Sequence, residues 1–191
     1  MKEIILLGSG QTHGACPYNK ETWGVNYVVR YPDFLKNGNK LFFFDDLSTF
    51  NPRVMTFADL YNNRHLLEFV TTSKNVEFLK KYNVTATVYP LDQIIHKYKT
   101  HYFANSISYM VAYAMFTGVE SMTLYGIDHV NYREYLMAKA GLEYWLGRAQ
   151  QSGMDINICA GSAVLRTITD KLYGYEFKYD KNSVPEEKFI V

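Results

Sequence analysis

The stretch Lys2-Glu-Ile-Ile-Leu-Leu-Gly-Ser-Gly10 decides the fold. A short apolar run ends abruptly in Gly8-Ser9-Gly10, which predicts a buried first strand that leads into a glycine turn. In α/β proteins such a turn lets the backbone approach a phosphate or nucleotide, and the N-terminus of the next helix favours anions. We therefore expect Gly8, Ser9 and Gly10 to contact a ligand. The alternative is a tight strand–helix turn that binds nothing.

The glycine turn does not complete either of two common nucleotide-binding motifs. Gln11, Thr12 and His13 follow Gly10, so the third glycine of G-x-G-x-x-G is missing. The lysine of a P-loop is missing as well. The expectation of ligand contact at this turn therefore depends on a second segment of the chain.

That second segment runs from residue 102 to residue 129. Asn105 and Ser106 are natural N-cap residues, and apolar side chains follow them at helical spacing. A strand is then predicted over residues 121–125, and Gly126-Ile-Asp128-His129 follows at its carboxyl end. Because open parallel sheets bind ligands beyond the carboxyl ends of their strands, we expect this segment and the glycine turn to share a site.

The rest of the chain alternates between strand and helix patterns. Further strands are predicted over residues 41–44, 69–72, 85–89 and 155–159, and residues 22–29 are expected to form a strand or a loop. Helices are predicted over residues 53–66, 76–82, 133–151 and 162–172, with an irregular or helical segment over 91–99. This alternation indicates an α/β fold with a mainly parallel sheet flanked by helices, and we expect one domain over residues 1–191.

Composition excludes several functional classes. The formal net charge of +1 over 191 residues gives no strong nucleic-acid signal. No apolar run approaches the roughly 18 residues that span a membrane. Cys16 and Cys159 form no metal-binding spacing, so we expect free thiols in a reducing compartment. With no signal peptide recognisable at the N-terminus, we expect a cytoplasmic protein without membrane contact. The oligomeric state does not follow from the sequence.

Two acidic positions follow predicted strands. Asp45-Asp46 follows residues 41–44, where a carboxylate suits a ribose hydroxyl or a divalent cation, or else a turn or helix cap. Asp128-His129 follows residues 121–125, and a histidine beside a carboxylate suits general-base catalysis. Each of these residues also has a structural interpretation, in which Asp128 orients a neighbour or caps a helix and His129 is only hydrogen-bonded. No ligand spacing demands a metal.

A resemblance to known families rests on four groups of residues. They are Gly8-Ser9-Gly10, Asn26, Asn105-Ser-Ile-Ser108 and Tyr125-Gly-Ile-Asp128. This pattern resembles the single-domain bacterial sialyltransferases over about residues 2–30 and 102–165. It is also similar to the MptE-like family, which includes archaeal hydroxymethyl-dihydropterin pyrophosphokinases. Both resemblances imply a Rossmann-like domain.

The sialyltransferase resemblance implies roles for particular residues. Ser9, Gly10, Asn26, Asn105 and Ser106 would bind the cytidine monophosphate part of a donor, and Tyr132 and Tyr135 would hold its phosphate. The catalytic histidine of that family lies in a lid region with no residue-by-residue match here, and His129 stands in for it.

Three functions follow as expectations. The first is glycosyl transfer from a nucleotide-sugar, with His129 or Asp128 as the base and with Tyr132, Tyr135 or Arg148 neutralising the leaving phosphate. The second is pyrophosphoryl transfer of the MptE-like type, which would need Mg²⁺ held by aspartates. The third is a non-catalytic protein that binds or sequesters a nucleotide.

Overall fold

The computed structural model describes residues 2–48, 55–130, 135–166, 172, 175 and 176, without the side chains of residues 135–137. Seven strands form one sheet in the order β5-β4-β3-β2-β1-β6-β7, and all six neighbouring pairs are parallel. The expected α/β fold with a parallel sheet is therefore confirmed.

The strands are β1 (Glu3–Leu7), β2 (Glu21–Val25), β3 (Lys40–Phe42), β4 (Glu68–Thr71), β5 (Thr87–Val88), β6 (Ser121–Tyr125) and β7 (Asp155–Ile158). The α-helices are α1 (Pro32–Asn37), α2 (Phe57–Asn62), α3 (Ser73–Lys80), α4 (Leu91–Tyr98), α5 (Ser106–Phe116) and α6 (Tyr135–Gln151). Two 3₁₀ turns are η1 (Gln11–Ala15) and η2 (Asn26–Arg30).

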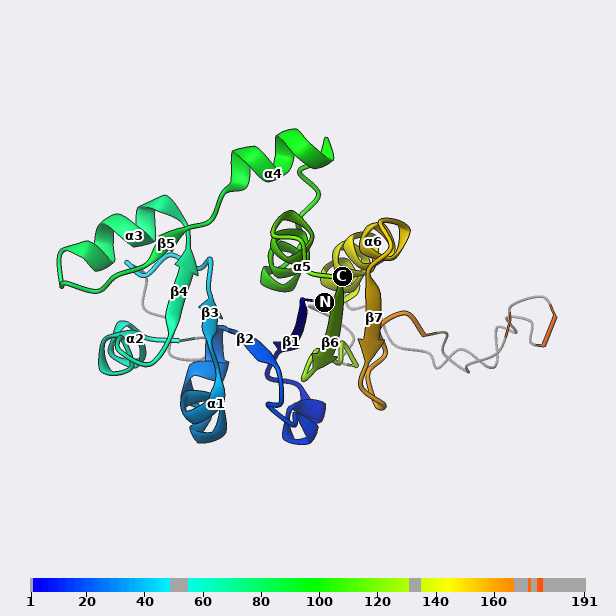
Figure 1. The fold of residues 1–191 in the computed structure, drawn as a ribbon, viewed down its shortest axis with the longest axis horizontal. Helices are drawn as coiled ribbons and strands as arrows, with labels where there is room; N and C mark the ends of the chain where they lie inside the picture. Colours follow the sequence, from blue (N-terminus) through cyan, green and yellow to red (C-terminus); the bar gives the residue numbers. More distant parts are fainter. Residues whose placement is uncertain (1, 49–54, 131–134, 167–171, 173–174, 177–191) are drawn as a thin grey trace, which may run out of the picture.

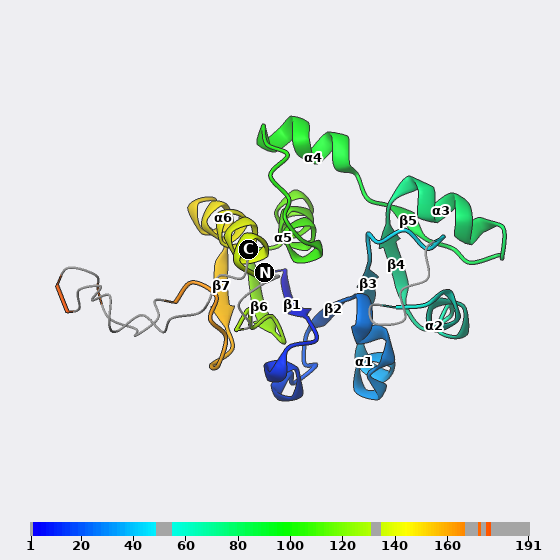
Figure 2. The ribbon, with the colours of Figure 1, turned by 180° about the vertical axis from the view of Figure 1, so that it is seen from behind.

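Helices cover both faces of the sheet, as Figures 1 and 2 show from opposite sides. One core cluster joins Ile4 and Leu6 of β1 to α4, α5 and α6. A second cluster joins Leu7 of the same strand to η2, α1 and α2. Because β1 is buried on both faces, its sequence is a continuous apolar run rather than an alternating one.

The chain changes direction within the sheet beside β1. It builds outward from β1 through β2, β3 and β4 to β5, and then returns to place β6 on the other side of β1. The register pairs Leu7 with Tyr125, so β1 and β6 end side by side. Open α/β sheets bind ligands at such a point, outside the carboxyl ends of the strands.

Three local expectations differ from the structure. The glycine turn leads into the short 3₁₀ turn η1 and not into an α-helix, so it supplies no helix N-terminus for an anion. Of the helix expected over 53–66, the described residues 55–66 are helical only in α2. Residues 162–166 of the helix expected over 162–172 are not helical, and most of the remainder lies outside the described residues.

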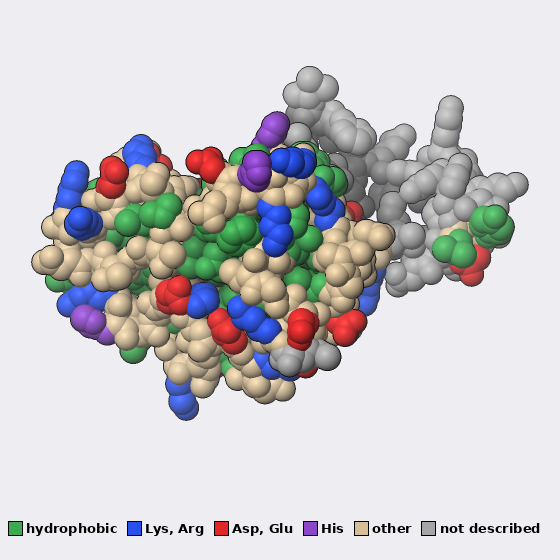
Figure 3. Space-filling view, turned by 45° about the horizontal axis from the view of Figure 1, so that its top comes forward, with side chains coloured by type: hydrophobic (Ala, Val, Ile, Leu, Met, Phe, Trp, Pro, Cys, Tyr) green, Lys and Arg blue, Asp and Glu red, His purple; other side chains and the backbone are tan. Residues whose placement is uncertain are grey.

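Charge is mixed on the face drawn in Figure 3. Basic and acidic side chains are interspersed among the described residues there, and hydrophobic side chains gather near the centre. Within the described part of the chain, no helix has the length and apolar character needed to cross a lipid bilayer. Cys16 and Cys159 are both free thiols, as expected.

Candidate functional site

A pocket of about 540 Å³ lies at the carboxyl edge of the sheet, between the glycine turn, the end of β6 and the start of α5. Its wall includes eight of the residues that the sequence nominated for ligand binding or catalysis. These are Gly8, Ser9, Gly10, Asn26, Asn105, Ser106, Asp128 and His129. The two segments that the sequence paired, more than 90 residues apart, therefore meet at one cavity.

The glycine turn is fastened to the end of β6. Gly8 N–H donates to the Tyr125 carbonyl at 2.9 Å, and Gly10 N–H donates to the Gly126 carbonyl at 2.7 Å. A Cβ at Gly8 would collide with the carbonyl of Gly126. At Gly10, a Cβ would lie 2.5 Å from Asp128 Oδ2. The protein's own packing therefore requires these glycines, whatever the turn does for a ligand.

Asp128 connects the two sides of this junction. It is 4% exposed, and its Oδ2 accepts a hydrogen bond from Thr12 N–H at 2.8 Å. The Thr12 hydroxyl donates to Asp128 Oδ1 and accepts from Gly126 N–H at 2.7 Å. Both carboxylate oxygens are thus engaged by η1. These contacts favour the interpretation in which Asp128 orients its neighbours over the one in which it is the base.

His129 follows Asp128 at the pocket wall. It is half-buried, and its backbone has a left-handed φ of 47°. Burial lowers the pKa of His129. The positive charge of Lys139 lowers this pKa further, and the negative charge of Glu143 raises it. A histidine with a lowered pKa is neutral at pH 7 and has a ring nitrogen able to accept a proton. Its chemistry and position therefore suit a general base.

The N-terminus of α5 opens onto the same pocket. Asn105 caps the helix, because its Oδ1 accepts from Ser108 N–H and from the Ser108 hydroxyl, both at 2.8 Å. Its Nδ2 donates to the Ala138 carbonyl at 3.0 Å, which ties the start of α5 to α6. No acidic side chain occupies the first turn of α5. The partial positive charge of this 11-residue helix therefore faces the cavity unopposed from that turn.

We predict that Asn105→Ala lowers the free energy of unfolding by about 0.5–2 kcal/mol, because it removes the cap of α5. Thr56→Ala is the matched control, since Thr56 caps α2 in a capping box and does not line the pocket. Urea denaturation should show similar losses for the two variants. Nucleotide affinity should fall only for Asn105→Ala. Equal affinities for the two variants would contradict a ligand role for this helix start.

Asn26 stands directly after β2, also with a left-handed φ, of 49°. Asparagine is one of the few residues apart from glycine that adopts this conformation readily. Its Nδ2 donates to Asp45 Oδ2 at 3.3 Å. Its Oδ1 is buried and accepts no hydrogen bond from the residues that the structure describes. An acceptor in this state, on the wall of a cavity, is suited to a donor group of a ligand.

The remaining nominated residues are Tyr132, Tyr135 and Arg148. Tyr132 falls outside the described residues, and only the backbone of Tyr135 is described, as the first residue of α6. Arg148 does not line the pocket; its guanidinium donates to the Tyr98 carbonyl at 2.8 Å and lies over the Trp145 ring. The expected role of Arg148 at a leaving phosphate is therefore wrong for this arrangement.

The aspartates after β3 have different partners. Asp46 pairs with Lys74, whose ammonium group lowers the pKa of that carboxyl to about 2, together with hydrogen bonds from Ser48. Asp45 contacts Asn26. Among the described residues, no three His, Cys, Asp or Glu side chains converge in a way that suits a metal ion.

Sequence reasoning does not identify several residues in and around the pocket. Thr12 was noted only as a departure from a glycine motif, yet its hydroxyl links Asp128 to Gly126. Ala104 and Ala138 line the cavity as well. A Cβ on Gly141 would lie 2.5 Å from the Ala104 Cβ, which shows how closely α6 packs against the start of α5. The contact between α5 and α6 gives Ala104 and Ala138 their place in the pocket wall, and no local sequence pattern predicts that contact.

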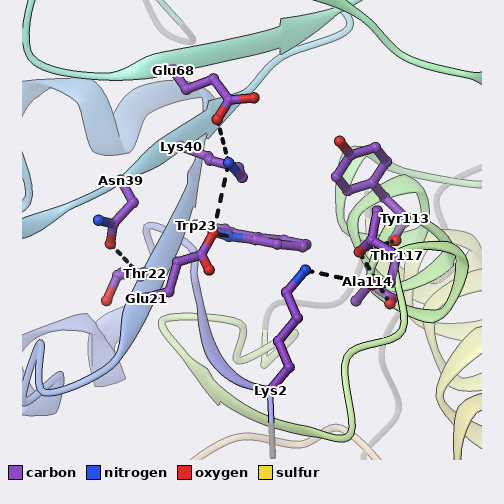
Figure 4. Close-up of polar contacts among 10 residues, drawn as sticks. All are labelled: Lys2, Glu21, Thr22, Trp23, Asn39, Lys40, Glu68, Tyr113, Ala114 and Thr117. Atoms are coloured by element: carbon purple, nitrogen blue, oxygen red, sulfur yellow. Dashed lines mark hydrogen bonds and ion pairs between the residues drawn. The ribbon is translucent and has the colours of Figure 1, made fainter.

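A second, wide cleft of about 740 Å³ lies at the amino edge of the sheet. Figure 4 shows how its charged groups satisfy one another: Lys40 lies between Glu68 and Glu21, and Glu21 accepts the Trp23 Nε1–H at 2.7 Å. These interactions join β2, β3 and β4. Because these charged groups stabilise the sheet by pairing with one another, we take the pocket at the carboxyl edge as the candidate site.

No protein-family model matches the chain, and no curated protein sequence does either. Solved structures do match. The sialyltransferase CstII from Campylobacter jejuni in complex with cytidine-5′-monophosphate aligns with a TM-score of 0.54 and 19% identity, covering 85% of this chain and 81% of CstII. CST-II with a trisaccharide acceptor and CMP aligns at 0.56 and 17%, covering 82% and 80%. The chain therefore has a sialyltransferase-like fold.

Proposed function

We propose that the protein binds a nucleotide-sugar and transfers its glycosyl group to an acceptor. One observation carries the proposal: the residues expected to hold a cytidine nucleotide, drawn from two remote segments, line one cavity at the switch point of the sheet. Its volume lies in the range of small-molecule sites. The similar structures of CstII contain CMP and CMP-3FNeuAc, which agrees with such a ligand.

Each wall of the pocket has a role in this proposal. The N-terminus of α5 binds the anionic part of the donor. The Gly8–Gly10 turn forms the facing wall, with the Gly8 and Gly10 N–H groups donated to Tyr125 and Gly126. Asn26 Oδ1 accepts from a donor group of the nucleoside. Tyr132 and Tyr135 remain candidates for the phosphate. During transfer, the acceptor hydroxyl attacks the anomeric carbon, the bond from that carbon to the phosphate oxygen breaks, and His129 takes the hydroxyl proton.

Two other functions make different predictions. A pyrophosphokinase of the MptE-like type would require Mg²⁺, and EDTA would abolish its activity. None of the comparisons supports that family link. A non-catalytic nucleotide-binding protein would return a CMP-sugar unchanged. Both alternatives keep nucleotide binding at this pocket and differ only in the chemistry.

The proposal is tested by a thermal-shift titration with CMP, followed by incubation with a CMP-sugar. We expect CMP to raise the melting temperature, because a ligand of the folded state stabilises it by RT ln(1 + [L]/Kd). We also expect slow release of free sugar from the CMP-sugar, unaffected by EDTA. No shift up to millimolar CMP would contradict the proposal. A shift without turnover would favour the binding protein.

A further inference from the structure

We propose that Asp45 is a positioning residue for the nucleotide site, which fixes the Asn26 amide so that its carbonyl oxygen serves as a hydrogen-bond acceptor in the pocket. The proposal rests on the proposed function for the identity of the ligand. Its geometry is independent of that function. The Asn26 carbonyl oxygen would accept a hydrogen bond from the ligand, either from a ribose hydroxyl or from the exocyclic amine of a base.

The orientation of the Asn26 amide follows from the chemistry of its neighbour. An ionised carboxylate only accepts hydrogen bonds, so the amide group that faces Asp45 Oδ2 at 3.3 Å must be the NH₂. The other end of the same planar group is then the oxygen. That oxygen is buried, lies on a residue of the pocket wall and accepts no hydrogen bond from the described residues. Asp45 therefore decides that Asn26 presents an acceptor and not a donor.

The backbone of Asp45 is fixed by a hydrogen bond from the side chain of Asn75. Asn75 of α3 is 1% exposed, and its Nδ2 donates to the Asp45 carbonyl at 2.8 Å and to the Thr71 hydroxyl oxygen at 2.9 Å. The Thr71 hydroxyl donates to the Phe43 carbonyl at 2.5 Å. Asn75 Oδ1 accepts from Leu47 N–H at 3.1 Å. A fully used buried amide thus fixes the backbone on both sides of Asp45.

The backbone of Asn26 adds a second constraint. Its left-handed φ of 49° restricts the position to residues such as Asn, Asp or Gly. Aspartate can therefore replace Asn26 without new backbone strain. Asn26 and Asp45 can therefore be exchanged for each other. In the exchanged pair, a carboxylate oxygen of residue 26 is still the acceptor in the pocket.

The test compares three variants by calorimetric titration with CMP. Asp45→Asn lets the Asn26 amide turn either way, and we expect the affinity to fall by about 2- to 10-fold, the range for one hydrogen bond. Asn26→Asp places two carboxylates face to face, and we expect a larger loss that lessens as the pH falls from 7 to 5, since a shared proton relieves the repulsion. The exchange Asn26→Asp/Asp45→Asn restores the donor–acceptor pair and should recover most of the affinity.

A neighbouring carboxylate provides the control. Asp46→Asn removes a carboxylate next in sequence that pairs with Lys74 and does not line the pocket, so CMP affinity should not change. Titrations with 2′-deoxy-CMP and UMP identify the donor group. The nucleotide that lacks this group should bind to Asp45→Asn and to the parent with the same affinity. A loss confined to melting temperature would indicate a structural role only.

The outcomes separate this inference from the proposed function. If the parent protein binds CMP and the exchange variant binds no better than Asn26→Asp, the positioning role of Asp45 is wrong and nucleotide binding stands. If Asp45→Asn binds CMP as tightly as the parent, the positioning role of Asp45 is also wrong. If the parent binds none of these nucleotides, the proposed function is wrong and the inference falls with it.

Discussion

Asp128→Asn will lower the free energy of unfolding by about 1.5–3 kcal/mol, the range for hydrogen bonds to a charged group. The carboxylate is 4% exposed and accepts from both Thr12 N–H and the Thr12 hydroxyl. Replacing one oxygen by an NH₂ sets a donor against a donor in a site closed to water. The junction between the glycine turn and β6 should loosen, and nucleotide affinity should fall with it.

Thr12→Val is the matched variant for this prediction. It removes the hydroxyl that bonds to Asp128 and accepts from Gly126 N–H, and Thr12 does not line the pocket. If Asp128 acts through the junction, both variants should lose stability and affinity together in urea denaturation and CMP titration. The contrary outcome is an Asp128→Asn protein of parental stability that has lost turnover, beside a Thr12→Val protein that keeps it. Asp128 would then be catalytic.

His129→Asn should lower turnover by a factor of about 10² to 10⁴ with little change in CMP affinity, the effect of losing a general base. Asparagine is chosen because it tolerates the left-handed backbone at this position. His96→Asn, on the exposed surface of α4, is the control and should keep parental turnover. Steady-state rates and melting curves for both variants measure this.

The pH dependence of the parent protein tests the same role. Because burial lowers the pKa of His129, the neutral, base-competent form persists below the ordinary histidine value. The acidic limb of kcat/KM should therefore have its midpoint below about 6.5. A midpoint above that value, or an unchanged rate in His129→Asn, would remove His129 from the mechanism.

Much of the fold and the site could be predicted because the relevant signals are local. The continuous apolar run of β1 marks a strand buried on both faces, and Asn105 marks the start of α5. Parallel strands end at one edge of a sheet, so two polar strand ends could be placed together without a structure. That reasoning brought Gly8–Gly10 and Asp128-His129 to one pocket.

What could not be predicted depends on contacts between remote residues. The need for glycine at position 10 comes from Asp128, and Thr12 lies 116 residues from its carboxylate partner. The register of Leu7 opposite Tyr125 creates these contacts, and no local pattern reports it. Arg148 likewise had the charge for a phosphate, but α6 directs its guanidinium to Tyr98 and Trp145.

The most direct test of the central claim is a crystal structure of the protein with CMP bound. The account predicts the nucleotide in the pocket between the Gly8–Gly10 turn and the N-terminus of α5. The Asn26 Oδ1 atom should lie within hydrogen-bonding distance of a ligand hydroxyl or amine. A nucleotide bound elsewhere on the molecule, or one with no polar contact to residues 105–108 and none to Asn26, would contradict the account.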